Sequence, residues 1–314
     1  MTALSPDKVS ILLPTLNGAR YIRESIASCL EQTHRNLEVI VVDGGSTDGT
    51  LDIIAGFHDP RLILIDQAGN EGSISGALNL GLDHMSGDYW TWMQDDCRYA
   101  PEAIATMLGY LHSNSAVDFV YTDYWRIDEN GNTIDLMPVG PSQELPQREC
   151  VGVCFLTRMR VYEELGHYSV KHWLVQDYEF RLRVLGRFRM EPLHVPLYYY
   201  RVHPQSLTGR YGLDVERAVV AMKQDLGYLD DGQARKALAY IDVWQGFIDY
   251  KAGNLRQARR YLLRGLRKDP SHLGNRGIVS VVIESVIGSS RMRAVRNVSH
   301  RLRRLSDPTN EAHS

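Results

Sequence analysis

Short apolar runs alternate with amphipathic segments along the first two thirds of the chain. Residues 9–14 and 37–42 are apolar runs of strand length, and residues 89–93 form a third run that contains two tryptophans. Between the first two runs, residues 19–32 carry apolar side chains at helical spacing, which predicts a strand–helix–strand unit with a right-handed crossover. We therefore expect an α/β fold built on a mostly parallel sheet.

Acidic residues stand where two of these predicted strands end. The second run continues directly into Asp43, and the third is soon followed by Asp95 and Asp96. In open α/β sheets ligands bind beyond the carboxyl ends of the strands, and neighbouring carboxylates repel each other unless a cation lies between them. The pattern favours a divalent-cation site, although an acidic turn after a buried strand would contain the same residues.

The segment after the second run is rich in glycine and small polar residues, in the order Asp43-Gly44-Gly45-Ser46-Thr47-Asp48-Gly49. Its glycines allow positive φ and a close approach of the backbone to a ligand. The acid can accept hydrogen bonds from a base or a ribose, or it can simply close an Asx-type turn. Ser46 or Thr47 can cap a helix that begins near Asp48. The spacing matches neither the dinucleotide-binding glycine pattern nor a phosphate-binding loop.

Five segments taken together resemble the family 2 glycosyltransferases, which have the A-type nucleotide-sugar-binding fold. In chain order they are VSILLPTLNGARYI (9–22), LEVIVVDGGSTDGT (37–50), GSISGALNLGLDHMSGDYWTWMQDD (72–96), WLVQDYEFRLRV (173–184) and YYYRVHPQSLT (198–208). Each segment is weak by itself, and their order and spacing make the resemblance specific. It spans residues 8 to about 210 and implies a Rossmann-like nucleotide-diphospho-sugar transferase fold.

The resemblance assigns roles to individual residues around the nucleotide. The nucleoside pocket would be lined by Thr15, Asn17, Asp43 and Ser46. Within this set Asp43 would read the base by accepting a hydrogen bond from a ring N–H.

The resemblance also assigns the metal ligands and the base. Asp95 and Asp96 match the metal motif, with Asp96 the better candidate for a direct ligand. His203 would be a further ligand or would face the diphosphate together with Arg201. Asp177 matches the catalytic base, which takes the proton of the acceptor hydroxyl.

The sequence departs from the family pattern at two positions. Met93 stands where many members have a first acid, and Gln176 replaces the glutamate of the usual Glu-Asp pair. A glutamine can donate and accept hydrogen bonds but cannot take a proton. Residues 172–185 are expected to form the helix that carries Asp177, with Arg181 and Arg183 as ordinary charges on its exposed face.

The implied reaction is the inverting transfer of a sugar from a nucleoside diphosphate to a hydroxyl acceptor, in the synthesis of cell-surface polysaccharide or another glycan. The donor would be of the UDP, dTDP or GDP type, the cofactor Mg²⁺ or Mn²⁺, and the acceptor a glycan, a lipid-linked glycan or a protein. Two other classes remain open. One is a nucleotide-sugar-binding protein or scaffold without transferase activity, which the two departures favour. The other is a nucleotidyltransferase, which has a similar sheet.

The pattern becomes all-helical after residue 213. We therefore expect a catalytic domain over residues 1–212 and a C-terminal all-helical extension over 213–305, followed by a disordered tail at 306–314. Within the extension, small and apolar residues are spaced as in one tetratricopeptide repeat, at Gly246, Ala258, Leu262, Gly265 and Pro270. This spacing predicts a helical hairpin over residues 239–272.

A basic segment follows near the end of the chain. Residues 291–305 contain six arginines and no acid, and their apolar residues fall at helical spacing. A basic amphipathic helix of this kind can lie on an anionic bilayer surface, while a solvated charged helix would have the same composition.

Composition narrows the partners and the compartment. The net charge of −3 offers no reason to expect nucleic acid as a partner, and the four cysteines do not form a metal or disulfide framework. The first residues lack the pattern of a signal peptide, and the sequence has no run of about 18 apolar residues. These features predict a cytoplasmic protein, in peripheral contact with the inner face of the membrane if the basic segment binds lipid.

Overall fold

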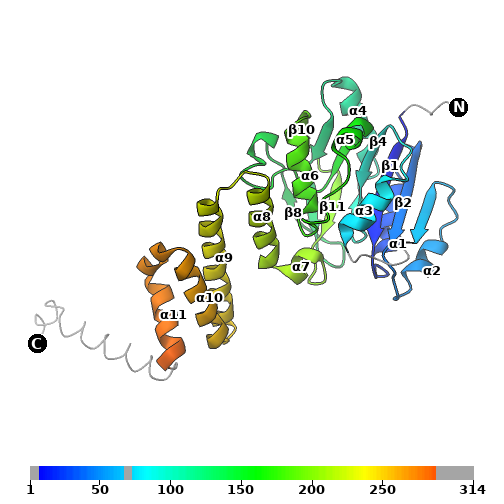
Figure 1. The fold of residues 1–314 in the computed structure, drawn as a ribbon. Helices are drawn as coiled ribbons and strands as arrows, with labels where there is room; N and C mark the ends of the chain where they lie inside the picture. Colours follow the sequence, from blue (N-terminus) through cyan, green and yellow to red (C-terminus); the bar gives the residue numbers. More distant parts are fainter. Residues whose placement is uncertain (1–6, 67–72, 288–314) are drawn as a thin grey trace, which may run out of the picture. The chain divides into compact units, whose positions relative to one another are not determined.

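The computed structural model describes residues 7–66 and 73–287, drawn in colour in Figure 1. The chain divides into two compact units, Met1–Arg210 and Tyr211–Ser314. The division falls two residues before the boundary that the sequence predicts.

The first unit contains a seven-stranded sheet with the strand order β10-β6-β9-β4-β1-β2-β3. Only β9, among the strands described, runs antiparallel to its neighbours β4 and β6. The sheet confirms the predicted α/β fold with mostly parallel strands. Its strands are β1 (Val9–Thr15), β2 (Leu37–Asp43), β3 (Leu62–Asp66), β4 (Tyr89–Trp92), β6 (Phe119–Thr122), β9 (Phe155–Arg158) and β10 (Met190–Leu193).

Helices alternate with strands β1 to β4, as expected, and the alternation is less regular further along the chain (Figure 1). The predicted helix between the first two strands is α1, which is shorter than residues 19–32 at both ends. The helices are α1 (Ile22–Leu30), α2 (Thr50–Ala55), α3 (Ile74–Leu82), α4 (Ala103–Ser113), α5 (Met159–Leu165), α6 (Gln176–Leu185) and α7 (Leu207–Tyr211).

The prediction that Ser46 or Thr47 caps the next helix is wrong. Helix α2 begins at Thr50 and its N-cap is Gly49, at φ 91°, without a side-chain cap. The Ser46 hydroxyl is already engaged by the amide of Asn17, and the amide of Thr50 instead donates to the Asp48 carboxylate at 3.2 Å.

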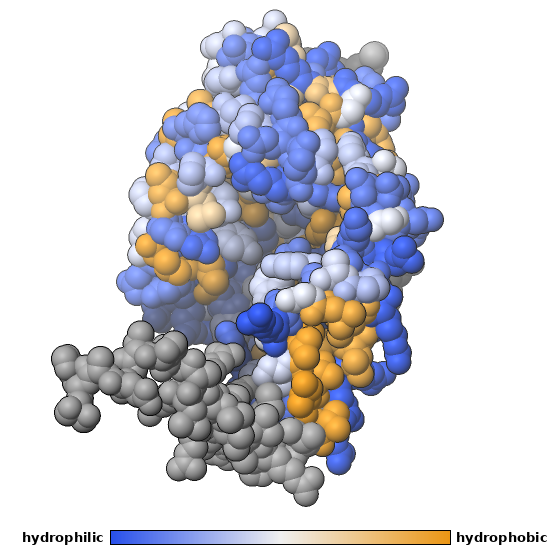
Figure 2. Space-filling model, turned by 90° about the vertical axis from the view of Figure 1, so that its left-hand side faces the viewer, coloured by the Kyte–Doolittle hydropathy of each residue, from blue (hydrophilic) through white to orange (hydrophobic). Residues whose placement is uncertain are grey.

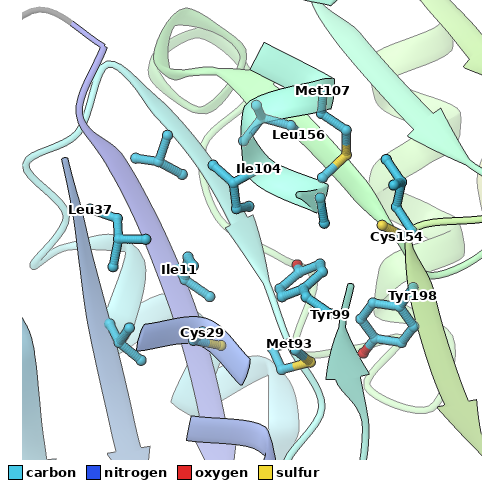
Figure 3. Packing of buried hydrophobic residues seen from close by; sticks show 14 of the residues in the cluster. Ile11, Cys29, Leu37, Met93, Tyr99, Ile104, Met107, Cys154, Leu156 and Tyr198 are labelled. Atoms are coloured by element: carbon cyan, nitrogen blue, oxygen red, sulfur yellow. The ribbon is translucent and has the colours of Figure 1, made fainter. Parts of the chain in front are cut away.

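Alternating residues of the central strands explain why helices cover both faces of the sheet. Ile11 and Val39 belong to one buried layer together with Ile26 of α1 and Met107 of α4, as Figure 3 shows for Ile11 and Met107. On the other face, Gly81 of α3 lies so close to the sheet that an added Cβ would be 3.2 Å from Leu12 and 3.3 Å from Val42. Both faces are therefore buried, and β1 and β2 read as continuous apolar runs.

A second, four-stranded sheet joins the segment after the paired acids to a strand about 100 residues later in the chain. Its order is β5-β11-β7-β8. Strand β5 begins two residues after Asp96, at Arg98, and pairs antiparallel with β11, with Tyr99 opposite Tyr198. This pairing brings Arg201 and His203, at and just after the end of β11, to the segment that contains Asp95 and Asp96. The strands are β5 (Arg98–Tyr99), β7 (Tyr124–Ile127), β8 (Thr133–Met137) and β11 (Tyr198–Arg201).

The second unit is helical. Helix α9 starts with a capping box of Asp230 and Gln233 and packs closely on α10, because a Cβ added at Gly246 would lie 2.7 Å from Leu262. The predicted hairpin over 239–272 falls on this pair of helices, and its likeness to a tetratricopeptide repeat stays a prediction. Residues 291–305 and 306–314 lie outside the described part. The helices are α8 (Leu213–Asp225), α9 (Asp231–Lys251), α10 (Leu255–Lys268) and α11 (Arg276–Ile287).

Candidate active site

Three strand ends form one edge of the large sheet. Thr15 at the end of β1 pairs with Asp43 at the end of β2, and β4 runs parallel to β1 on its other side, with Trp92 opposite Leu12. The acids that follow β4 therefore lie at the same edge as Asp43. This is the edge where the topology of an open α/β sheet places a ligand.

The two carboxylate oxygens of Asp43 have different surroundings. Its side chain is fully buried, and Oδ2 accepts the amides of Gly45 and Ser46, both at 2.9 Å. Oδ1 is buried and has no hydrogen-bond partner among the described residues. A buried carboxylate oxygen without a donor costs free energy of the order of 1–3 kcal/mol, so it is a place where a ligand N–H would be favourable.

The loops after β1 and β2 are clasped together. The amide of Asn17 donates to the Ser46 hydroxyl at 2.8 Å, and the Asn17 side-chain oxygen accepts the amide of Thr47 at 2.8 Å. Asn17 has φ 57°, the left-handed region that asparagine tolerates. Asn17 and Ser46 thus lie together as expected, and their contacts hold the shape of the rim beside Asp43.

Asp95 points inward, beneath the turn after β1. Its Oδ2 accepts the Thr15 hydroxyl at 2.6 Å. Burial, together with the charge of Asp96, raises the pKa of Asp95 to about 6, against the lowering effect of the Thr15 hydrogen bond. Gly18 makes this packing possible, because a Cβ there would lie 2.5 Å from the same carboxylate oxygen.

Asp96 is held on the other side, against His203. Its Oδ2 lies 2.9 Å from Nε2 of His203, and its Oδ1 accepts the Cys97 thiol at 2.9 Å. The side chain of Asp96 is 18% exposed and that of His203 is 8% exposed. Hydrogen bonds thus hold the Asp96 and His203 side chains in place, and both side chains keep some exposure to solvent.

The Asp96–His203 pair fits a divalent cation. Neighbouring ligands of an octahedral ion with bonds of about 2.1 Å are about 3 Å apart, which is close to the spacing of these two atoms. In the described ranges no group of three or more His, Cys, Asp and Glu side chains could hold a metal by itself. Mg²⁺ and Mn²⁺ suit such a partial site, since they accept substrate phosphates and water as further ligands.

Arg201 is placed differently from the expectation. Its side chain is 2% exposed, with Nε donating to the Asp96 carbonyl at 2.7 Å and one terminal nitrogen to Glu24 at 2.5 Å. The other terminal nitrogen lies 3.2 Å from the Asp128 carbonyl and 3.3 Å from that of Glu129. All three nitrogens are engaged by the protein, so Arg201 fixes the backbone of Asp96 and does not face outward. Sequence reasoning missed Glu24, whose role depends on this contact between distant segments.

Helix α6, which carries Asp177, packs against β4, the strand that precedes the paired acids. Phe180 of this helix packs edge-on against Trp90 of β4, with ring centroids 5.6 Å apart. Asp177 lies in the first turn of α6, and its Oδ1 accepts the amide of Tyr178 at 2.8 Å. The expectation that Arg181 is an ordinary surface charge is wrong, because its side chain is 3% exposed and lies 3.3 Å from Asp177.

Comparison with known proteins identifies relatives of the first unit. The model of the family described as "Glycosyl transferase family 2" matches residues 10–166, half of the chain. An uncharacterised glycosyltransferase of Rickettsia conorii is 31% identical over 201 residues, which cover 59% of this chain and 32% of that protein. The PGL/p-HBAD biosynthesis glycosyltransferase of Mycobacterium bovis is 29% identical over 181 residues, 55% of this chain and 68% of the relative. The chain thus spans about a third of the length of the Rickettsia relative.

Solved structures share the fold at low sequence identity. Residues 1–349 of Staphylococcus aureus TarS, in complex with UDP, align with a TM-score of 0.57 and 17% identity over 90% of this chain and 92% of that one. The mannosyltransferase PcManGT of Pyrobaculum calidifontis, in complex with GDP-Man and Mn²⁺, aligns with a TM-score of 0.56 and 18% identity, over 95% and 82% of the two chains.

Proposed function

The chain belongs to glycosyl transferase family 2, and we propose that it moves a sugar from a nucleoside diphosphate to a hydroxyl acceptor at the edge formed by β1, β2 and β4. The observation that carries the proposal is the buried Oδ1 of Asp43, a hydrogen-bond acceptor to which none of the described residues donates, at the sheet edge that the paired acids share. A nucleobase ring N–H would supply that donor. Asn17 and Ser46 support the same pocket by holding the loop against which the nucleoside would lie.

The diphosphate would be bound at Asp96 and His203, the two groups that fit a divalent cation. The cation, Mg²⁺ or Mn²⁺, would supply charge neutralisation for the leaving diphosphate. Asp95 supports the site from below, since its hydrogen bond to Thr15 ties the paired acids to the end of β1. Arg201 holds the backbone of Asp96 in place.

Asp177 is the carboxylate we assign as the base. It accepts the proton of the acceptor hydroxyl while the hydroxyl oxygen bonds to the anomeric carbon and the bond to the diphosphate oxygen breaks. Attack from the side opposite the leaving group inverts the anomeric centre. General-base assistance of this kind typically contributes about 10²–10⁴-fold.

The donor can be sought among those of the structural neighbours. TarS has been crystallised with UDP-GlcNAc and PcManGT with GDP-Man and Mn²⁺. A thermal-shift screen of UDP-, dTDP- and GDP-sugars, with and without Mn²⁺, should identify one nucleotide that raises the melting temperature, because ligand binding stabilises the folded state by mass action. No stabilisation by any of these nucleotides would overturn the proposal. Stabilisation without Mn²⁺-dependent turnover would favour a binding protein or scaffold.

We also propose that the acceptor is reached at an anionic membrane surface. Apolar side chains come to the surface of α11 at helical spacing, with Val279 37%, Ile283 43% and Val286 65% exposed. Figure 2, coloured by hydropathy, shows several apolar patches in orange on the face it displays, one of them low in the view. The arginine-rich segment 291–305 follows a few residues later in the sequence. Apolar and cationic residues in succession suit an interfacial segment. In the part of the chain that is described, no helix is long and apolar enough to cross a membrane.

A further inference from the structure

Arg181 is a buried cation between two carboxylates. One terminal nitrogen lies 3.1 Å from Oε2 of Glu149, and the other lies 3.3 Å from Oδ2 of Asp177. The guanidinium is almost fully removed from water, while the side chains of Asp177 and Glu149 are 29% and 36% exposed. A buried charge is tolerated when opposite charges and hydrogen bonds compensate for its lost hydration. Asp177 and Glu149 are thus the two carboxylates that compensate the buried charge of Arg181.

Each of the two acids is also held by the backbone. Oδ1 of Asp177 accepts the amide of Tyr178 at 2.8 Å, and Oε1 of Glu149 accepts the amide of Val151 at 2.9 Å. The second oxygen of each acid is the one near Arg181. The segment of Glu149 is joined to α6 once more by the Tyr178 hydroxyl, which donates to the Leu145 carbonyl at 2.7 Å.

The contact of Arg181 with Asp177 is close but is not a hydrogen bond. The terminal nitrogen nearest Asp177 is buried and has no hydrogen-bond partner in the described residues. The cation therefore attracts the carboxylate without occupying a lone pair of Oδ2. Arg183, two residues along the same helix, differs, because it donates to both oxygens of Glu179 at 2.8 and 2.9 Å.

We propose that Arg181, balanced by Glu149, is a positioning residue for the proton-accepting carboxylate of Asp177. The inference rests on the proposed function, in which Asp177 takes the proton of the acceptor. Arg181 restrains the carboxylate on one side and leaves its oxygen able to receive a proton. Glu149 draws the guanidinium the other way, so that it does not pair with Asp177 alone.

The test is a kinetic cycle with the Asp177→Asn variant. The probe is UDP-GlcNAc or GDP-Man with Mn²⁺, whichever raises the melting temperature, and the readout is release of the nucleoside diphosphate. Arg181→Gln should lower kcat about tenfold with the donor KM changed less than about twofold, and Arg181→Lys should recover part of the loss. In the Asp177→Asn background, Arg181→Gln should lower kcat less than about twofold, because the carboxylate that Arg181 positions is absent.

Arg183→Gln is the matched control, because it breaks an ion pair on the same helix without touching Asp177. Its effect on kcat should be the same in both backgrounds. Equal losses from Arg181→Gln with and without Asp177 would overturn the inference, as would an unchanged kcat. If Arg181→Gln does not fold, Glu149→Gln, at a partly exposed position, replaces it in the same comparison. Glu149→Gln should then lower kcat several-fold when Asp177 is present and not in the Asp177→Asn background. Wild-type rates in Asp177→Asn would instead overturn the assignment of the base.

Discussion

At the scale of single residues, the site depends on acids whose two oxygens have different partners. Asp43 uses one oxygen to close its turn, and its other oxygen is buried and accepts no hydrogen bond from the residues that the structure describes. Asp95 and Asp96 are adjacent in the sequence and point to different partners, Thr15 and His203. This division separates an acid that supports the site from one that can bind a ligand.

The first residue-scale prediction concerns Asp43. Asp43→Asn keeps an oxygen for the turn but places an amide where a base N–H needs an acceptor, and Asp43→Ala removes the contact. Both variants should bind the nucleoside diphosphate without Mn²⁺ roughly tenfold to a hundredfold more weakly, because a hydrogen bond to a charged group is worth about 1.5–3 kcal/mol. Isothermal titration measures this affinity. Unchanged affinity in both folded variants would leave Asp43 as a turn residue.

The second prediction concerns Gly18. In Gly18→Ala the new Cβ would meet the Asp95 carboxylate at 2.5 Å and the Thr15 hydroxyl at 2.6 Å, so the hydrogen-bonded side chains of Asp95 and Thr15 must shift. We expect destabilisation by about 1–3 kcal/mol and loss of Mn²⁺-dependent nucleotide binding. Gly109→Ala is the control, because nothing lies within 4 Å of its added Cβ in helix α4. It should be neutral or slightly stabilising in denaturant titrations, whereas equal behaviour of the two variants would contradict the packing at Gly18.

At the scale of elements, the sequence predicted what depends on local pattern. The apolar runs predicted β1, β2 and β4, and the acids that follow β2 and β4 predicted the sheet edge at which Asp43 and the paired acids lie. The roles of Arg181 and Arg201 could not be predicted in this way. Their partners, Glu149 and Glu24, are distant in the sequence, and a single arginine on a helix or at the end of a strand gives no local sign that it is buried. The spacing of small residues did locate the α9–α10 pair but not the buried acid within it.

That buried acid, Asp242 of α9, supports a prediction on pH. It is fully buried and paired with Arg264, Lys268 and Arg217. Despite its burial, the hydrogen bonds from Arg264, Lys268 and Arg217 lower the pKa of Asp242 from 3.8 to about 2. A lowered folded-state pKa contributes stability that is complete above pH 4 and is lost as the pH falls toward 2.

Thermal melts followed by circular dichroism between pH 5 and pH 2 test this. The wild-type helical unit should lose roughly 2 kcal/mol of stability from this group over that range. Asp242→Asn should be less stable at pH 5 and should lose less on acidification. Asp249→Asn, on the same helix, should keep the wild-type pH dependence. A wild-type slope in Asp242→Asn would show that other groups dominate.

At the scale of the whole molecule, we assign the two units different roles. The first unit contains the proposed nucleotide-binding edge of β1, β2 and β4. The second contains the exposed apolar side chains of α11, which precede the arginine-rich segment in the sequence. Full-length protein should therefore sediment with vesicles of anionic lipid at low salt and less so at high salt, because salt screens the attraction. Deletion from residue 278 onward should abolish sedimentation and leave nucleotide binding intact. Full-length protein that stays in the supernatant at low salt would contradict the membrane proposal.

We propose that this chain is a metal-dependent transferase and that the diphosphate of its donor is bound at Asp96 and His203. The most direct measurement is release of nucleoside diphosphate from the selected donor as Mn²⁺ is titrated, for the wild type and for Asp96→Asn. The wild type should show saturable dependence on Mn²⁺. Asp96→Asn, with a wild-type fold by circular dichroism, should lose about 10²-fold or more of the rate and the metal dependence of nucleotide binding. Wild-type turnover with Mn²⁺ in folded Asp96→Asn would contradict the account.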